Sequence, residues 1–524
     1  MVMILGMFLL LGIINIGASF QNNRMLLSMN FCNSYEEIIK GKTERQDMDI
    51  RDAVKFNGCR IPYAAALNTF YISQDTDNGS WGGYFTPAPG YEIYFHVDEM
   101  WGNKQAAIES NYKFSVLIEK GEQYRTANLV VSGLPVLALN ESGEMGAPLS
   151  MVLLDADEES CYEGFCTCRM RGQTSTTFPK FGYKVELCDK ELDEVKHPLL
   201  GLRNDDDWIL NPLYGDSTKI REKLGYQIWE DMQAYNKTED LSSNITYVEL
   251  VFNDTYWGLY GLQEPVDEKM LSLKENEIYY KKTDTRIPLE EHFVTEDGQE
   301  YIPGFRIKYP KVEDIRAEDW EPLLPYVQNF CYDLYDPPEE VADIETLTSL
   351  LNFENAMDYK IFLAVIAGED NISKNINYCL RYEDDGFKMH MMPWDLNLSF
   401  GDTGLLADSI YDSSYIETNM DSREFVTLYR SDPELVEETI RTKWEEYRKS
   451  FLSEEYLKGL AESYMAELVQ SGAMTRDSER WPECNNSKDP SEIYEFLEGH
   501  LKYLDEYFAS EDWWERDPLL REES

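Results

Sequence analysis

Alternating hydrophobic and polar positions dominate the first third of the chain. Between residues 56 and 154, turn residues separate six short alternating runs: Ala64–Ile72, Gly90–Val97, Tyr112–Glu119, Thr126–Val131, Val136–Asn140 and Leu149–Leu154. Short strands at this spacing are typical of an all-β sandwich. We therefore predict a small all-β, sandwich-like domain over residues 56–154, with a structural or binding role, and a polar linker over residues 20–55 before it.

Strand patterns continue beyond residue 155 but are now mixed with helical ones. Gly182–Cys188 alternates as a strand, and Tyr247–Phe252 and Tyr256–Leu262 flank the turn Asn253-Asp254-Thr255 as a hairpin. The hairpin ends at the acidic residue Glu264. These strands predict a sheet in the first half of this second region.

Helical spacing appears between and after these strands. One apolar stripe recurs every four residues and predicts a helix over Asp216–Met232, capped by Asp216 or Ser217: Ile220, Leu224, Ile228 and Met232. Leu347–Ile366 is predicted as an amphipathic helix, and the chain after Gly401 is mostly helical. We therefore predict an α+β domain over residues 155–510 and an acidic tail over residues 511–524.

The stretch Ile366–Gly401 carries two acidic loops at the two ends of one predicted hairpin. The strand candidates are Tyr378–Tyr382 and Phe387–Met392, joined by a turn at Asp384-Asp385-Gly386. Asp370 and Asn375 lie in the loop before the hairpin, and Asp395 follows Pro393-Trp394 in the loop after it. Loops at the open end of a hairpin can converge, so we expect these side chains to meet.

Composition narrows the range of partners. The chain has 524 residues, enough for two or three domains, with 98 acidic against 48 basic residues and a formal net charge of −50. Phosphates would be repelled, which argues against nucleic acid and against an anionic membrane surface. A nucleotide remains compatible if a divalent metal and local bases mask its phosphates.

The first 19 residues form one apolar run that ends in small residues. We interpret residues 1–19 as a secretory signal peptide or, because no basic residue precedes the run, as an uncleaved membrane anchor. The nine cysteines include the cluster Cys161, Cys166 and Cys168, which we interpret as thiols or a disulfide of an extracytoplasmic loop rather than a zinc site.

The order of these elements matches the order of parts in a protein-kinase fold. The polar turn around Arg171-Gly172 comes first, followed by Lys180 and the Lys184-bearing strand, then the capped helix and the hairpin that ends at Glu264. Kinase chemistry needs a base for the acceptor hydroxyl, ligands for Mg²⁺ and a cation for the phosphates. In this layout Asp370 is the base, Asn375 and Asp395 are metal ligands, and Lys180 or Lys184 is the phosphate cation.

Several stretches in this order resemble the CotH kinase family, the spore coat protein H-like atypical secreted protein kinases. The matching stretches cover about residues 150–510: RGQTSTTFPKFGYKVEL (Arg171–Leu187), DSTKIREKLGYQIW (Asp216–Trp229), VELVFNDTYWGLYGLQEPVD (Val248–Asp267), KNINYCLRY (Lys374–Tyr382), MPWDLNLSFG (Met392–Gly401) and Arg480-Trp481. The resemblance implies a two-lobed, atypical kinase-like domain. The β-rich segment before it is similar to an accessory domain of some bacterial members.

The resemblance also implies ATP, Mg²⁺ or Mn²⁺, and phosphorylation of Ser/Thr on extracellular or spore-coat proteins. Arg171, Gly172 and Glu264 would contact the nucleotide, and Lys281 joins Lys180 and Lys184 as a third candidate for the phosphates. The family usually has a second acid two residues after the metal-binding Asp, where this chain has Asn397. The metal-ligand role of the first loop is open between Asn375 and Asn377, because kinase spacing favours the former and the family's Asn-Tyr pair the latter.

Two other functions are compatible with the same residues. One is a pseudokinase-type binding protein of the cell or spore surface, and the other is an enzyme of the same fold that transfers AMP. The leading hypothesis is a secreted or surface-anchored ATP-dependent protein kinase.

Overall fold

The computed structural model describes residues 23–77, 79–172, 174–283, 293–294, 300–332, 338–384, 386–402 and 420–510. Helices and several sheets are mixed, as the sequence predicts. The contacts divide the chain into two compact units. Unit 1 comprises residues 1–217, 245–264 and 466–488, and unit 2 comprises residues 218–244, 265–465 and 489–524.

The first part of unit 1 is built on a mixed seven-stranded sheet. The sheet order is β1 (Asn30–Cys32), β8 (Glu92–His96), β9 (Lys113–Lys120), β10 (Gln123–Ser132), β6 (Thr69–Ser73) and β5 (Tyr63–Ala64), with β2 (Thr43–Glu44) also on β10. A second sheet has the order β4 (Cys59–Arg60), β3 (Val54–Phe56) and β7 (Phe85–Pro87). The linker predicted over residues 20–55 is therefore wrong, because β1 and β2 are strands of the large sheet.

Short helices accompany these sheets. They are α2 (Arg24–Leu27), α3 (Tyr35–Ile38) and α4 (Lys104–Glu109). The rings of Phe56 and Phe95 each lie close to that of Phe85, with centroids 5.0 and 5.2 Å apart, and thereby join the two sheets in one core.

A closed seven-stranded barrel forms the second part of unit 1. Its order is β11 (Val136–Asn140), β12 (Leu149–Leu154), β13 (Tyr162–Arg171), β14 (Gly182–Cys188), β17 (Asp207–Asn211), β19 (Thr255–Gln263) and β18 (Ile245–Phe252). The strands β11 and β12, which we predicted in the sandwich-like domain, pair with β18 and β13 instead. The predicted boundary at residue 154 is corrected accordingly, since an alternating strand pattern does not encode which strand is its partner.

The helix α13 (Ala473–Arg480) joins the large sheet to the barrel. Its Arg476 side chain is buried and pairs with Glu249 of β18 at 2.7 Å, while the same guanidinium reaches Ser132 of β10 at 3.2 Å. Residues of both parts also belong to one hydrophobic cluster. Unit 1 is therefore one packed body, and residues 466–488, from late in the sequence, belong to it.

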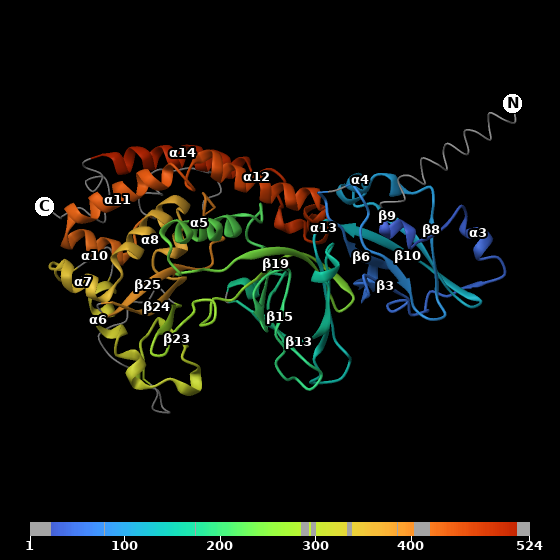
Figure 1. Ribbon diagram of the computed structural model, residues 1–524, viewed down its shortest axis with the longest axis horizontal. Coiled ribbons are helices and arrows are strands. Elements are labelled where there is room, and N and C mark those ends of the chain that lie inside the picture. The colour runs from blue at the N-terminus through green and yellow to red at the C-terminus, as the bar shows by residue number, and fades with distance from the viewer. Residues whose placement is uncertain are drawn as a thin grey trace. The chain divides into compact units, whose positions relative to one another are not determined.

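Unit 2 contains an antiparallel four-stranded sheet and most of the helices (Figure 1). The sheet order is β23 (Phe305–Tyr309), β20 (Ile278–Lys282), β24 (Ile376–Glu383) and β25 (Gly386–Pro393). The helices are α5 (Arg221–Asn236), α6 (Leu323–Phe330), α7 (Ile344–Leu350), α8 (Phe353–Ile366), α10 (Arg423–Ser431), α11 (Pro433–Arg448), α14 (Ser491–Ala509) and, up to residue 465, α12 (Glu454–Gln470). Both α7 and α8 pack against β25. Two small hairpins complete the described strands: β15 (His197–Pro198) with β16 (Asn204–Asp205) in unit 1, and β21 (Phe293–Val294) with β22 (Glu300–Tyr301) in unit 2.

Two predicted helices differ in their bounds. The apolar stripe of α5 is fully buried, as predicted. The helix begins at Arg221 instead of Asp216, because Lys219 has a positive φ of 65°, which is incompatible with a right-handed helix. The predicted amphipathic helix over Leu347–Ile366 is two helices. Leu351 is extended between them, Asn352 caps α8, and every residue of 355–366 is buried, so α8 is a core helix.

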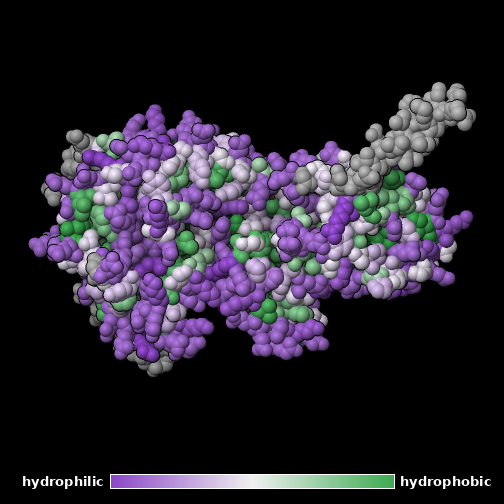
Figure 2. All heavy atoms as spheres, in the orientation of Figure 1, coloured by the Kyte–Doolittle hydropathy of each residue, from purple (hydrophilic) through white to green (hydrophobic). Residues whose placement is uncertain are grey.

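Figure 2 shows one face of the molecule covered mostly by hydrophilic residues, as the acidic composition leads us to expect. All nine cysteines lie in the described parts and carry free thiols, including the cluster for which we predicted thiols or a disulfide. Among the described residues, no helix is both long and apolar enough to span a bilayer. The apolar run predicted as a signal peptide or anchor, residues 1–19, and the predicted tail, residues 511–524, lie outside them.

Candidate functional site

The predicted hairpin is confirmed as β24 and β25 of unit 2. Its register pairs Ile376, the first residue of β24, with Pro393, the last residue of β25. The backbone amide of Trp394 extends this pairing by donating to the carbonyl of Asn375 at 3.0 Å. The loop before β24 and the loop after β25 therefore start from the same end of the hairpin, next to each other. We call them the Asp370 loop (residues 367–375) and the Asp395 loop (residues 394–402).

Buried contacts join the two loops side to side. The Nδ2 atom of Asn371 donates to the carbonyl of Trp394 at 2.8 Å and lies 3.3 Å from the carbonyl of Asn375. The amide of Phe400 in the Asp395 loop donates to the carbonyl of Ile366, the last residue of α8 directly before the Asp370 loop, at 2.7 Å. Since Asn371 is fully buried, these bonds are shielded from water and fix the loops relative to each other.

The carboxylate of Asp370 is partly exposed and has a cation beside it. Its Oδ2 atom lies 2.9 Å from Nζ of Lys374 and 3.5 Å from Nδ2 of Asn375, and the side chain is 26% exposed. Asp370 is therefore accessible from outside and electrostatically balanced by Lys374. An acceptor hydroxyl could approach this carboxylate and give up its proton to it.

Four non-glycine residues of these loops have left-handed backbones, and the predicted metal ligands Asn375 and Asp395 are two of them. Asn375 has φ 55° and Asp395 has φ 61°, values that are uncommon for residues other than glycine. Such conformations persist where the surrounding structure imposes them, and they cluster at active sites and ligand clamps. The side chain of Asp395 is exposed.

The two asparagines of the first loop differ in their surroundings. Asn377 lies within β24, is fully buried, and its Oδ1 atom accepts a hydrogen bond from the hydroxyl of Tyr279 at 2.9 Å. Asn375 is half-buried in the loop itself, beside Asp370. The structure thus favours Asn375 over Asn377 as a ligand. Asn397, the third asparagine predicted as a metal ligand, is half-buried two residues after Asp395.

The candidate lysines of unit 1 lie in ion pairs. Lys180 is fully buried, with Nζ 2.8 Å from Asp477 and its ammonium group over the ring of Tyr260. A phosphate could reach it only if this buried pair opened, so Lys180 has a structural position. Lys184 is more accessible and bridges Glu186 at 2.5 Å and Asp207 at 3.0 Å.

Lys281 belongs to unit 2 and lies close to the two loops. It is half-buried on β20, opposite Asn377 of β24, and its Nζ atom is 4.6 Å from the ring centroid of Trp394. Trp394 immediately precedes Asp395. Of the three lysines predicted for the phosphates, Lys281 is thus the one that the structure brings beside the Asp395 loop.

The remaining predicted nucleotide contacts lie in unit 1. Arg171 ends β13, and Gly172 follows it with φ 108°, a conformation that requires glycine. Residue 173 of this turn lies outside the described residues. Glu264 accepts a hydrogen bond from the backbone amide of Arg203 at 3.0 Å. These three residues are in unit 1, and Asp370 and Asp395 are in unit 2.

Three residues that shape the site were not predicted from the sequence. They are Asn371, which joins the loops, Lys374, which pairs with Asp370, and Tyr226 of α5, which accepts a hydrogen bond from the amide of Asp395 at 3.1 Å. Lys374 could have been found from its spacing of four residues from Asp370. Asn371 and Tyr226 act on backbone groups, and a sequence carries no signal for such contacts.

The donor set of the loops fits a magnesium-type ion. In the part of the chain that the structure describes, no three His, Cys, Asp or Glu side chains gather as a ready-made metal cage. Mg²⁺ commonly takes only one or two carboxylates and fills its other positions with water and substrate phosphates. The exposed carboxylate of Asp395 and the amide oxygens of Asn375 and Asn397 provide that kind of oxygen set.

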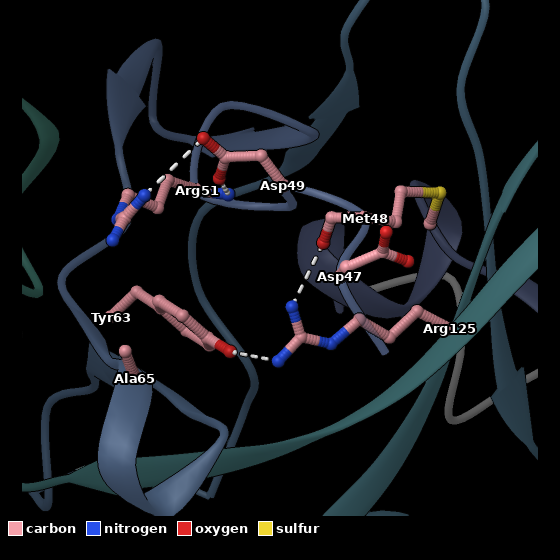
Figure 3. Close-up of a pocket in the computed structure, with 7 residues that line it drawn as sticks. All are labelled: Asp47, Met48, Asp49, Arg51, Tyr63, Ala65 and Arg125. Carbon is pink, nitrogen blue, oxygen red and sulfur yellow. Dashed lines mark hydrogen bonds and ion pairs between the residues drawn. The ribbon is translucent and has the colours of Figure 1, made fainter. Parts of the chain in front are cut away.

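A cavity of about 290 Å³ lies elsewhere, in unit 1, and is lined by Asp47, Met48, Asp49, Arg51, Tyr63, Ala65 and Arg125 (Figure 3). Arg125 donates to the carbonyl of Met48 at 2.8 Å and to the hydroxyl of Tyr63 at 2.9 Å. Arg51 lies 3.3 Å from Asp49. These guanidinium groups already have protein partners, and no predicted site residue lines the cavity, so we do not assign it the chemistry.

Comparison with known proteins supports the same region. The family model described as CotH kinase protein matches residues 168–510, more than half of the chain. This span includes β14, α5, the four-stranded sheet and both loops. Among curated proteins, none matches the chain.

Proposed function

Because the chain belongs to the CotH kinase protein family, we propose that it is a kinase-like phosphotransferase that transfers the terminal phosphate of ATP to a protein hydroxyl. The observation that supports this proposal is that the Asp370 loop and the Asp395 loop start side by side at one end of the β24–β25 hairpin and are joined by the buried Asn371. A base and a metal-binding acid in adjacent loops are what phosphoryl transfer between oxygens requires.

In this proposal Asp370 orients the acceptor hydroxyl of a Ser or Thr and takes its proton as the oxygen attacks the phosphorus. Lys374 forms an ion pair with Asp370 at 2.9 Å and holds its carboxylate in place. The ammonium group of Lys281, beside Trp394, neutralises charge on the phosphates. Arg171, Gly172, Lys184 and Glu264 are proposed to contact the nucleotide.

Asp395 and Asn375 would hold Mg²⁺ or Mn²⁺, with Asn397 as a further, uncharged ligand. The ion would supply positive charge that masks the phosphate oxygens in this acidic protein. The left-handed backbones at Asn375 and Asp395 support these assignments, because strain at two ligands of one site is typical of a function that imposes it.

The acceptor is proposed to be a Ser/Thr-bearing protein outside the cytoplasm, such as a surface or spore-coat protein. This rests on the apolar run over residues 1–19, which predicts export, and on the family. The net charge of −50 favours a protein acceptor with basic or neutral surroundings over nucleic acid.

The test is transfer of label from γ-labelled ATP to casein or co-expressed surface proteins, with Mg²⁺ or Mn²⁺ present. We expect wild type to label the acceptor, and Asp395→Ala and Asp370→Asn each to reduce the rate by about 10²-fold or more. Asp384→Asn is the matched control, because Asp384 is an exposed acid at the other end of the same hairpin.

Three outcomes distinguish the competing functions. Equal, poor labelling by wild type and Asp395→Ala, together with no thermal shift by ATP and Mg²⁺, would leave a binding protein of pseudokinase type. Label that arrives only from α-labelled ATP would indicate AMP transfer. Label from γ-labelled ATP that is lost in both site variants and kept in Asp384→Asn supports the kinase.

A further inference from the structure

The conformation of Asp395 is held by a short chain of hydrogen bonds that starts on α5. The amide of Asp395 donates to the hydroxyl of Tyr226 at 3.1 Å, and that hydroxyl donates to Oε1 of Glu222 at 3.0 Å. Tyr226 and Glu222 are both buried, 2% and 5% exposed. One phenolic oxygen therefore accepts from the backbone of the Asp395 loop and donates to a carboxylate one helical turn away.

The helix α5 touches the same loop at two more points. A Cβ atom built on Gly225 would lie 2.8 Å from Cδ1 and 3.3 Å from Cβ of Leu396, so a larger residue there would force the Leu396 side chain to shift. Arg221, one turn earlier, lies 3.8 Å from Asp402 at the end of the loop. Arg221, Gly225 and Tyr226 thus present one edge of α5 to the loop from its beginning to its end.

We propose that Tyr226 is a positioning residue, whose hydroxyl holds the left-handed backbone of Asp395 and so aims its carboxylate at the divalent cation. The proposal follows from the backbone hydrogen bonds of the loop. The amide of Trp394 is bonded by Asn375 and its carbonyl by Asn371, while the amide of Asp395 is bonded by Tyr226. Removing the hydroxyl leaves the backbone amide of Asp395, whose φ is 61°, without that acceptor.

The two hydrogen bonds of the Tyr226 hydroxyl fit this role. A neutral phenol can accept from the amide and donate to the carboxylate at the same time, which a phenolate could not. Glu222 in turn fixes the direction of the hydroxyl.

The test compares Tyr226→Phe with wild type, and it rests on the proposed function because it reads out the metal. Mn²⁺ is titrated into the full chain with ATP at fixed concentration, and bound ion is followed by electron paramagnetic resonance alongside transfer of γ-phosphate. We expect Tyr226→Phe to raise the Mn²⁺ concentration at half-saturation about 10- to 100-fold and to lower kcat, with KM for the protein acceptor unchanged. An unchanged Mn²⁺ midpoint overturns the positioning role.

Tyr456→Phe is the matched control. Its hydroxyl also bonds a carboxylate of α5, Asp231 at 2.8 Å, but on the exposed surface. We expect this variant to keep the wild-type Mn²⁺ midpoint. If Asp395→Ala leaves the Mn²⁺ titration as it is in wild type, the metal role of the loop itself fails, which overturns the proposed function and the positioning role together. If only Tyr226→Phe leaves it unchanged, the positioning role alone fails.

Two further pairs keep the inference testable if Tyr226→Phe folds poorly. Glu222→Gln retains an oxygen that accepts from Tyr226 and should stay within about threefold of wild type, whereas Glu222→Leu should behave like Tyr226→Phe. Equal loss in both would assign Glu222 a direct ionic role instead. Gly225→Ala should also raise the Mn²⁺ midpoint, while Gly459→Ala on α12, where nothing lies within 4 Å of the added methyl group, should not.

Discussion

Asn371 donates its side-chain amide to the carbonyl of Trp394 at 2.8 Å, across the gap between the Asp370 loop and the Asp395 loop. The donor residue directly follows Asp370, and the acceptor residue directly precedes Asp395. One buried hydrogen bond thus lies a single peptide from each of the two candidate acids. The hydroxyl of Tyr359 on α8 in turn donates to the carbonyl of Asn371 at 2.8 Å, so the clamp is anchored in the core helix of unit 2.

Asn371→Ala should destabilise unit 2 and loosen the two acids together. The substitution leaves the buried carbonyl of Trp394 without this donor, which costs about 1–3 kcal/mol of the free energy of unfolding. Because the loops are then free to separate, the rate of phosphate transfer should fall more than the stability change alone explains. Urea unfolding and initial rates on the same preparation measure the two effects.

Asn329→Ala is the control for Asn371→Ala. The amide of Asn329 also donates to a backbone carbonyl at 2.8 Å, that of Pro325, but within a single helix, α6. We expect a stability loss at the low end of the same range and no change in rate. A rate for Asn371→Ala as high as that of Asn329→Ala would contradict the clamp.

Alanine substitutions of Asn375 and Asn377, the two candidate metal ligands of the first loop, should have different effects on Mn²⁺ binding and on stability. Asn375→Ala is expected to weaken Mn²⁺ binding about tenfold with little loss of stability, because Asn375 is a half-buried loop residue. Asn377→Ala should do the opposite, since it leaves the buried hydroxyl of Tyr279 without its acceptor. Mn²⁺ titration and thermal unfolding of both variants provide the measurement, and a reversed pattern would assign the ligand to Asn377.

Much of the site could be predicted because its signals are local. The hairpin, its turn and the positions of Asp370, Asn375 and Asp395 follow from alternation and spacing, and register then brings the two loops together. What the sequence could not predict depends on contacts far apart in the chain. Lys180 lies just before β14, where the sequence predicts a phosphate-binding lysine. In the structure it forms a buried ion pair with Asp477, almost 300 residues later.

The fold shows the same limit. The alternation of Val136–Asn140 and Leu149–Leu154 predicts strands and is confirmed, but which sheet receives a strand depends on partners such as β18, which lies about a hundred residues further along. The sequence of Leu347–Ile366 predicts one amphipathic helix, while its division at Leu351 follows from a bridge to Met389 of β25. Local propensity therefore predicts elements, and long-range pairing decides their bounds and neighbours.

The lysines of unit 1 should respond differently to substitution. Lys180→Met removes one partner of a fully buried pair and leaves the charge of Asp477 inside the protein, so the free energy of unfolding should fall by about 3–5 kcal/mol. Lys184→Met touches a partly exposed pair and should cost less than about 1 kcal/mol. A raised KM for ATP in Lys184→Met would support its proposed nucleotide contact. Stability of Lys180→Met equal to that of Lys184→Met would contradict the structural position of Lys180.

A second buried network ties the hairpin to the segment after α5 and makes stability depend on pH. His390 of β25 contacts Asp240 through Nδ1 at 2.7 Å and Glu383 through Nε2 at 2.8 Å, and Arg381 also reaches Asp240 at 2.9 Å. Burial alone would lower the pKa of His390, but the bonds to two carboxylates outweigh it and raise the pKa to about 9. The bond from His390 lowers the pKa of Glu383 to about 2.

The protein should therefore lose stability on the alkaline side as His390 loses its proton. Its folded-state pKa is raised, so the stabilising contribution is complete below about 6.5 and disappears as the pH rises through about 9. For wild type we expect a decrease on the order of a few kcal/mol in the free energy of unfolding between pH 6.5 and 9.5, and for His390→Gln a flatter profile over that range. His500→Gln is the matched control, because burial lowers the pKa of His500 to about 4 and keeps it neutral throughout. Urea unfolding at several pH values decides the matter: parallel profiles for wild type and His390→Gln would show that His390 is not the group that titrates.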